Sequence, residues 1–150
     1  MLVTRSFSKA YGLAGLRIGY GIASPAVIEA LETVRPRYNT NRLAQAAALA
    51  ALADDEHLRR TVTSNAEGRA YLAEQFARLG LFYVPSEANF LLLRVGDGRN
   101  AHRLLRDLGL LVQPMDRYGL PAFVRVSVGL PEENEHFIGV LRALGSGGRS

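Results

Sequence analysis

The stretch that decides the fold is residues 6–21, which read SFSKAYGLAGLRIGYG. Two short runs around it, Leu2–Arg5 and Arg17–Ala23, carry the apolar and β-branched residues that are typical of strands. Between them, Ser6–Leu16 is expected to form a glycine-containing loop with a single helical turn, because glycine permits backbone conformations that other residues avoid. The segment therefore predicts a strand–loop–strand unit.

The remainder of the chain predicts alternating helices and strands. Helices are expected at residues 25–34, 41–53, 55–79, 101–108 and 131–144, and strands at 82–84, 89–95, 110–113 and 123–128. Ser24 and one of Asp54 or Asp55 are the expected N-caps of the first and third helices. Segment 41–53 is apolar on nearly every side, which predicts a buried or interface helix. The fold class is therefore α/β, with a separate α+β unit in the second half.

Composition bounds the function. A hydrophobic fraction of 48% is enough for a packed core, and the absence of cysteine excludes disulfides and thiolate metal sites. The net charge is +4, but the arginines are dispersed among acidic residues, so a nucleic-acid partner is not expected. The three histidines, His57, His102 and His136, lie on separate predicted helices without metal-like spacing, so no metal is expected either. The sequence shows no membrane span or signal peptide, and we expect a cytoplasmic protein.

Lys9 is the one lysine among 18 basic residues; the others are arginine. A position that remains lysine in such a sequence indicates a need that arginine cannot meet. Lysine can lose its proton and attack a carbonyl carbon, whereas arginine stays protonated in proteins. Lys9 is therefore a candidate nucleophile towards an aldehyde.

The residues around Lys9 could bind an anion. Ser6 and Ser8 supply hydroxyl donors, and Arg17 supplies a planar fork of donors that suits a phosphate. An aldehyde with a phosphate group, held there, could form an imine with Lys9. From the residues alone, an ordinary strand–turn–strand with a solvated lysine is an equal alternative.

Residues 6–21 resemble the Schiff-base region of fold-type I aminotransferases that depend on pyridoxal 5′-phosphate (PLP), specifically the histidinol-phosphate aminotransferase family. The resemblance extends to RPRYN at 35–39, LAQAA at 43–47, PSEANF at 85–90, YGLP at 118–121, RVSVG at 125–129 and PEEN at 131–134. It implies that Lys9 holds PLP as a Schiff base. It also implies that Ser6, Ser8 and Arg17 bind the cofactor phosphate.

The same resemblance divides the chain into domains. It implies that residues 1–58 are the end of the cofactor-binding large domain and that residues 59–145 form a small α+β C-terminal domain. Residues 146–150 are expected to be a disordered tail. A homodimer, a small-molecule amino donor and a keto acceptor are implied partners.

Arg125 and Asn89 are the candidate substrate residues. On a strand, Val124, Val126 and Val128 would face one way, and Arg125 would face the other. An arginine on that face can hold a carboxylate by two parallel hydrogen bonds, and the resemblance assigns Arg125 to the substrate α-carboxylate. A solvated arginine is the alternative for Arg125, and strand-entry hydrogen bonding is the alternative for Asn89.

Gln113 departs from the family pattern, which has an arginine at the equivalent position. A neutral amide loses charge-assisted hydrogen bonds to a phosphate, each worth ~1.5–3 kcal/mol. The predicted function is therefore PLP-dependent transamination of the histidinol-phosphate type, in amino-acid biosynthesis. An aromatic or phenylalanine aminotransferase, or another PLP reaction, is the alternative.

The resemblance also implies that a long portion of the family's sequence, including the partner of the pyridine nitrogen, lies upstream of the part matched here. We therefore expect a truncated chain that lacks part of the active site. A non-catalytic remnant that dimerises through the 41–53 helix and binds no cofactor is the alternative from another functional class.

Overall fold

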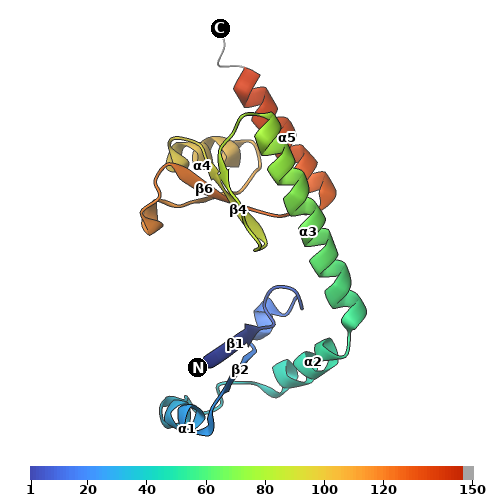
Figure 1. The fold of residues 1–150 in the computed structure, drawn as a ribbon, viewed down its shortest axis with the longest axis vertical. Coiled ribbons are helices and arrows are strands. Elements are labelled where there is room, and N and C mark those ends of the chain that lie inside the picture. Colours follow the sequence, from blue (N-terminus) through green and yellow to red (C-terminus); the bar gives the residue numbers. More distant parts are fainter. Residues whose placement is uncertain (147–150) are drawn as a thin grey trace. The chain divides into compact units, whose positions relative to one another are not determined.

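The computed structural model describes residues 1–146. Contacts divide the chain into two compact units, Met1–Val62 and Thr63–Ser150. The first contains a two-stranded sheet and the second a four-stranded sheet, each accompanied by helices (Figure 1). The chain is therefore a mixed α/β protein, as the sequence predicts.

The first unit opens with an antiparallel hairpin of β1 (Leu2–Ser6) and β2 (Gly19–Ala23). Strand β2 begins two residues later than predicted because Arg17 adopts a left-handed conformation, with φ of 54°. Arg17 thereby ends the 3-10 turn η1 (Ala14–Leu16), and its backbone N–H donates a hydrogen bond to Ala14 O. The predicted helical turn in the loop is confirmed.

Two helices follow the hairpin. Helix α1 (Pro25–Val34) has Ser24 at its N-cap position, but the Ser24 side chain makes no capping hydrogen bond. Helix α2 (Arg42–Leu52) is capped by Asn41, whose side-chain oxygen accepts a hydrogen bond of 2.8 Å from the backbone N–H three residues later. The two helices lie where the sequence predicts them.

Helix α2, predicted to be a buried or an interface helix, is partly buried within the described residues. Ala44 and Ala48 are its buried residues, whereas Leu43 is 78% exposed and Leu49 is 71% exposed. The two alanines are therefore covered on one side of the helix, and the two leucines project from the other. Within the described residues, the helix is buried along a single side.

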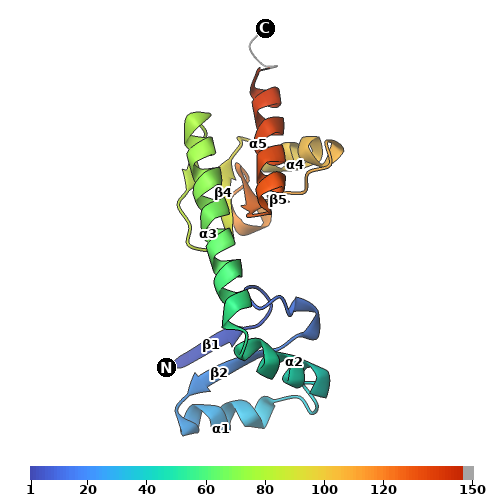
Figure 2. The same ribbon diagram turned by 90° about the vertical axis from the view of Figure 1, so that its right-hand side faces the viewer.

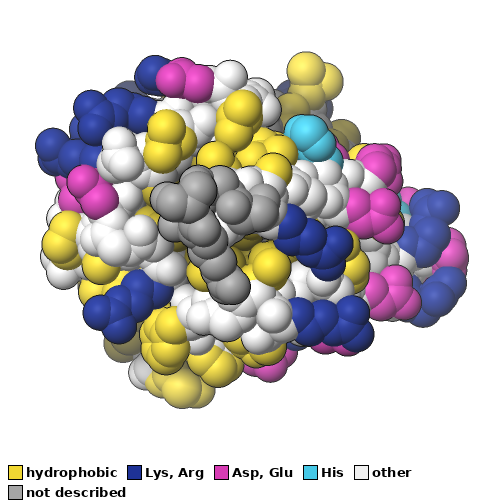
Figure 3. Space-filling model, turned by 90° about the horizontal axis from the view of Figure 1, so that it is seen from above, with side chains coloured by type: hydrophobic (Ala, Val, Ile, Leu, Met, Phe, Trp, Pro, Cys, Tyr) yellow, Lys and Arg dark blue, Asp and Glu magenta, His cyan; other side chains and the backbone are white. Residues whose placement is uncertain are grey.

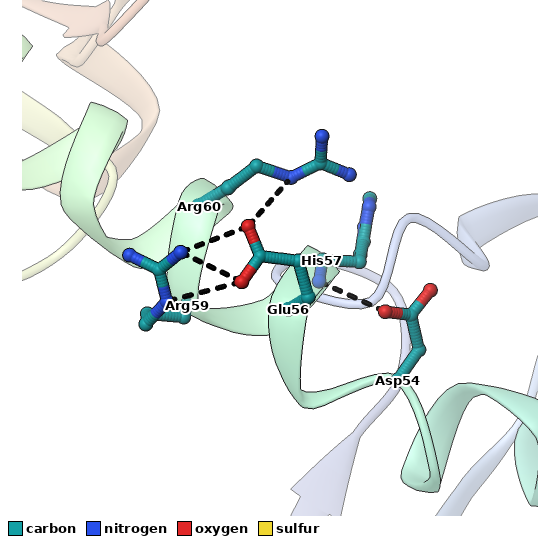
Figure 4. A network of polar contacts seen from close by, with 5 residues as sticks. All are labelled: Asp54, Glu56, His57, Arg59 and Arg60. Carbon is teal, nitrogen blue, oxygen red and sulfur yellow. Dashed lines mark hydrogen bonds and ion pairs between the residues drawn. The ribbon is translucent and has the colours of Figure 1, made fainter.

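The long helix α3 (Asp55–Arg78) begins with a polar network (Figure 4). Asp54, one of the two predicted caps, accepts a hydrogen bond of 2.9 Å from the His57 backbone N–H. Glu56 pairs with Arg59 at 2.6 Å and with Arg60 at 3.8 Å, and both pairs lie on the exposed surface. Acidic residues in the first turn also favour the positive end of the helix dipole.

The second unit is an antiparallel sheet with helices packed on it. Its sheet has the order β3-β4-β6-β5, and its elements are β3 (Tyr83–Val84), β4 (Phe90–Arg94), α4 (Gly98–Asp107), β5 (Gln113–Pro114), β6 (Phe123–Ser127) and α5 (Pro131–Ser146), together with most of α3. Helices α3 and α5 lie side by side on the sheet (Figures 1 and 2). The core consists of Leu72, Phe76, Leu91, Leu93, Leu105, Val112, Val124, Val126, Phe137 and Ile138. One face of the sheet therefore supplies the core.

Three element boundaries correct the prediction. Strand β5 is confined to Gln113–Pro114 because the backbone N–H of Leu110 closes helix α4 by bonding Leu105 O, with Gly109 at φ of 81° between them. Helix α4 begins three residues early, since the Asp97 side chain caps it at 3.0 Å. Helix α5 continues to Ser146, the first residue of the predicted disordered tail; residues 147–150 lie outside the described residues.

Helices α3 and α5 meet at a position that excludes any side chain. A methyl group added at Gly68 of α3 would lie 2.6 Å from Val128 Cγ1 and 2.9 Å from Asn134 Nδ2. Asn134 is 3% exposed and exchanges two hydrogen bonds of 3.0 Å with the backbone of Gly129. Neither neighbour can move away without breaking these bonds or opening the core.

We predict that Gly68→Ala lowers the free energy of unfolding by about 1–3 kcal/mol, because the methyl group overpacks this contact. The control is Gly139→Ala in α5, where nothing lies within 4 Å of the added methyl group. That change should raise the free energy of unfolding by about 0.5–1 kcal/mol through helix propensity. Urea unfolding measures both, and equal effects of the two substitutions would contradict this packing.

Candidate functional site

The loop that carries Lys9 is closed by backbone hydrogen bonds. The N–H of Phe7 donates to Ile18 O at 3.2 Å, and the N–H of Leu13 donates to Phe7 O at 2.9 Å. Phe7 is 3% exposed, and its ring contacts those of Tyr11 and Tyr20 at centroid distances of 4.9 and 5.8 Å. Phe7 therefore anchors the base of the loop.

Lys9 lies in a tight turn at the exposed end of this loop. Its carbonyl accepts a hydrogen bond of 2.9 Å from the N–H of Gly12, and Gly12 has φ of 71°. A side chain at Gly12 would be strained at that φ, which explains the glycine in this position. Lys9 is exposed, so its amine is available to an external reactant.

Ser6 and Ser8 are brought together at the start of the turn. The Ser6 hydroxyl oxygen accepts a hydrogen bond of 3.0 Å from the backbone N–H of Ser8. This bond fixes the Ser6 side chain and leaves its own O–H free to donate. The two serines thus add hydroxyl donors to the segment that leads into Lys9.

Arg17 closes the other end of the loop. Its Nη1 donates to Ala14 O at 2.8 Å, and no carboxylate among residues 1–146 forms an ion pair with it. Most of its donors, and its full charge, therefore remain available. Two hydroxyls, an unneutralised guanidinium and an accessible primary amine form a donor set that fits an aldehyde bearing a phosphate group.

A second set of predicted residues lies on the four-stranded sheet. Val124 and Val126 of β6 are 0% and 5% exposed and face the core, while Arg125 between them lies on the opposite face. Gln113 of β5 is the direct cross-strand partner of Arg125. The predicted alternation of β6 is thus present, and Arg125 and Gln113 are neighbours.

Arg125 is an unusual cation. Its Nε is buried and has no hydrogen-bond acceptor among the described residues, and its guanidinium carbon lies 5.2 Å from the centre of the Phe90 ring. A buried donor without an acceptor costs free energy, so such groups are rare and point to a missing partner. An incoming carboxylate or phosphate would supply that acceptor.

Asn89 occupies a loop that α3 holds in place. Its backbone carbonyl accepts a hydrogen bond of 2.9 Å from the N–H of Val128, and the preceding carbonyl, of Ala88, accepts one of 3.2 Å from Arg69 Nη1. Arg69 also pairs with Glu87 at 2.7 Å. The structure places Asn89 on the exposed surface and bonds its backbone, consistent with strand-entry hydrogen bonding.

An ion pair ties α4 to the segment η2 (Asp116–Tyr118), which follows β5. Arg99 Nε donates to Asp116 at 2.8 Å. Hydrogen bonding to Arg99 lowers the pKa of the Asp116 carboxyl below its usual value. Asp116 therefore contributes stability above that usual pKa, and the contribution is lost as the pH falls through the lowered value.

Sequence reasoning missed Phe90 and Arg69, and it set His57 aside as a weak candidate. Phe90 and Arg69 act on residues far away in sequence, and strand register and helix packing are not visible in the chain itself. His57 lies at the Lys9 loop, since a methyl group added at Gly12 would be 4.0 Å from its Nε2. The one signal in the sequence was Gly12 itself, because a glycine in a tight turn can mark a place where another element packs closely.

Other classes of site find no support among residues 1–146. Those residues contain no cluster of histidine and carboxylate side chains that could hold a metal, and none of their helices combines the length and apolarity needed to cross a membrane. On the face drawn in Figure 3, basic and acidic side chains lie intermixed with apolar ones, unlike the single-sign field of a nucleic-acid surface.

Comparison with known proteins decides the family. The model of the family "Aminotransferase class I and II" matches residues 1–141. The chain belongs to this aminotransferase family. Among curated relatives, histidinol-phosphate aminotransferase 2 of Ralstonia nicotianae is 54% identical over 147 residues, and a histidinol-phosphate aminotransferase of Akkermansia muciniphila is 48% identical over 142 residues. The resemblance found in residues 6–21 thus extends over 95% of the chain in both cases.

Solved structures of aminotransferases have the same fold. The histidinol-phosphate aminotransferase of Sinorhizobium meliloti, solved with pyridoxal 5′-phosphate, matches 97% of the chain with a TM-score of 0.81 and 30% identity. An aspartate aminotransferase of Thermotoga maritima matches 94% with a TM-score of 0.80 and 28% identity. The chain covers 41% and 40% of these structures and 39% of the two curated relatives. The fold alone therefore does not distinguish between substrates.

We predict that Gly19→Ala opens the hairpin that carries the site, because its methyl group would lie 2.6 Å from Arg5 O in the paired strand. The exchange rate of the Phe7 amide hydrogen, measured by NMR, should rise more than about tenfold, because its bond to Ile18 is then lost. Gly15→Ala is the control, since nothing lies within 4 Å of its added methyl group. Unchanged Phe7 protection in Gly19→Ala would contradict the close strand pairing.

Proposed function

We propose that the protein takes part in PLP-dependent transamination, with Lys9 as the residue that binds the cofactor covalently. The observation that carries the proposal is the Ser6–Arg17 loop, which carries an exposed lysine, two serine hydroxyls and a guanidinium without an ion-pair partner among the described residues. The dependence of the family on PLP supports it, as does the S. meliloti relative, which was solved in complex with this cofactor.

When bound, pyridoxal phosphate supplies an aldehyde that joins to amines and a ring that withdraws electrons from the bonds of the substrate's α-carbon. In the proposed mechanism Ser6, Ser8 and Arg17 donate to the phosphate, and Arg17 partly balances its charge. Lys9 Nζ would hold the aldehyde carbon before the substrate arrives. The released Lys9 amine would then take the proton from the substrate's α-carbon as general base and deliver it to the former aldehyde carbon of the cofactor as general acid.

We assign Arg125 to the anionic group next to the reacting carbon of the substrate. Its unneutralised charge and its buried Nε without an acceptor among the described residues support this assignment. A carboxylate can bind a guanidinium by two parallel hydrogen bonds, which fixes the orientation of the substrate as well as its position. Asn89 and Gln113 are proposed to contact the substrate beside it.

The proposed substrates are histidinol phosphate as amino donor and a keto acid as acceptor, since the curated relatives named above are histidinol-phosphate aminotransferases. One observation favours an aromatic amino acid as a second candidate. The residue paired with Arg125 is the neutral Gln113, and the ring of Phe90 also contacts Arg125. A neutral, partly aromatic surround suits an uncharged side chain better than a phosphate.

Assembly and domain roles are also proposals. We propose that residues 1–58 belong to the cofactor-binding domain of the enzyme and that residues 59–145 form its small C-terminal domain, a boundary close to the division of contacts between Val62 and Thr63. A homodimer is proposed as the active form. The exposed leucines of α2 offer apolar surface that such an assembly could cover.

We predict that the purified protein, mixed with PLP and reduced with borohydride, carries the pyridoxyl group on Lys9. Peptide mapping by mass spectrometry locates the label. Lys9→Arg is the matched control, because arginine keeps the positive charge but cannot form the imine. A label that persists in Lys9→Arg, or no label in either protein, would count against the proposed cofactor role.

We predict that Gln113→Arg raises kcat/KM for histidinol phosphate about 10- to 100-fold relative to phenylalanine, if the phosphate is bound beside β5. The reason is that the arginine adds charge-assisted hydrogen bonds to a doubly charged group. Transamination of both amino donors is measured with the same keto acid. A fall in the ratio would place phosphate recognition away from β5, and Gln113→Leu controls for loss of the amide.

A further inference from the structure

The guanidinium of Arg125 is held by an aromatic ring, not by a carboxylate. Its central carbon lies 5.2 Å from the centre of the Phe90 ring, within the range of a cation–π contact. No aspartate or glutamate among residues 1–146 forms an ion pair with Arg125. Phe90 is therefore the described residue that fixes this cation.

Strand register makes this contact specific. In the β4–β6 pair, Leu92 is opposite Arg125, and Phe90 is opposite Ser127. Phe90 and Arg125 are thus diagonal neighbours on the sheet face away from the core, at a spacing that large side chains can bridge. A shift of the register by one residue would place Phe90 on the core face and end the contact.

The backbone that leads into Phe90 is itself fixed. The carbonyl of Asn89 accepts a hydrogen bond from the N–H of Val128, and the carbonyl of Ala88 accepts one from Arg69 of α3. Phe90 is half-buried. The segment that leads into Phe90 is therefore held both by the backbone that follows β6 and by α3.

An aromatic platform and a carboxylate would have opposite effects on ligand binding. A carboxylate would orient the guanidinium but would also neutralise it and occupy the donors that an anionic ligand needs. A ring attracts the cation through its quadrupole, leaves the charge in place and leaves the N–H groups in the guanidinium plane free. The ring therefore orients the guanidinium without lowering the affinity of the guanidinium for an anion.

We propose that Phe90 is a positioning residue for Arg125: it holds the guanidinium in the orientation that accepts an anionic ligand and preserves its charge. The inference deepens the proposed function and rests on it, because it takes Arg125 as the anion-binding residue. Phe90 acts through Arg125 and makes no bond to the ligand.

The test measures the contact and its consequence in the full chain with PLP present. In ¹H–¹⁵N NMR spectra, the ring current of Phe90 should shift the Arg125 side-chain resonances, and Phe90→Leu should remove that shift. Titration with 2-oxoglutarate should give a Kd that is roughly 3- to 10-fold higher for Phe90→Leu than for the unaltered protein. Phe90→Tyr retains the ring and should restore both values.

Two further variants separate the possible outcomes. Phe82→Leu removes a ring that contacts Phe123 and is 59% exposed, and it should leave the Kd unchanged. In an Arg125→Ala background, Phe90→Leu should have no additional effect. If Arg125→Ala weakens binding and Phe90→Leu does not, the inference is overturned and the proposed function stands. If Arg125→Ala leaves the Kd unchanged, the assignment of Arg125 in the proposed function fails.

Discussion

The alternation of strand β6 is the constraint on which the second unit depends. Val124 and Val126 pack in the core with α3 and α5, so the residue between them must lie on the other face. That residue is Arg125, and burial of the valines therefore determines where the cation lies. Its neighbours Gln113 and Phe90 follow from the strand order, because β6 lies between β4 and β5. One hydrophobic pattern thus supplies both the core and the position of a charged site.

In the first unit, backbone geometry determines the position of the candidate functional side chain, Lys9. Gly19 lets two strands approach closely, and Gly12 and Arg17 adopt left-handed conformations within the loop and at its end. These constraints leave Lys9 exposed while the neighbouring Phe7 is buried. Glycines and short hydrogen bonds fix the shape of the loop, and the Lys9 side chain stays available for chemistry. A fixed loop backbone with an exposed side chain suits the role proposed for Lys9, which is to bond to a cofactor and to release it.

The sequence predicted most of the fold because its signals are local. Proline and glycine positions located the helix ends, and period-two alternation located β6 and the orientation of Arg125. Strand β5 was predicted too long, because closure of α4 through Gly109 uses residues that look extended in the sequence. The sequence does not decide between a buried and an interface position for α2, since an apolar composition does not show which neighbours are present.

The sequence predicted less of the candidate site than of the fold. Phe90 and Arg69 were missed, and His57 was set aside, because register and helix packing bring them to their partners from distant positions. The roles of Lys9, Ser6, Ser8 and Arg17 came from a resemblance to a family, and the loop geometry is compatible with them. The proposed site residues fall into two groups, each described within its own unit: an amine for PLP and a guanidinium for the substrate's anionic group. A crystal structure of the protein grown with PLP and 2-oxoglutarate tests both together. We expect continuous electron density between Lys9 Nζ and the cofactor, and a carboxylate of 2-oxoglutarate bound by two parallel hydrogen bonds to Arg125 over the Phe90 ring. Cofactor density away from Lys9, or an Arg125 side chain turned from Phe90 with no anion bound, would contradict this assignment.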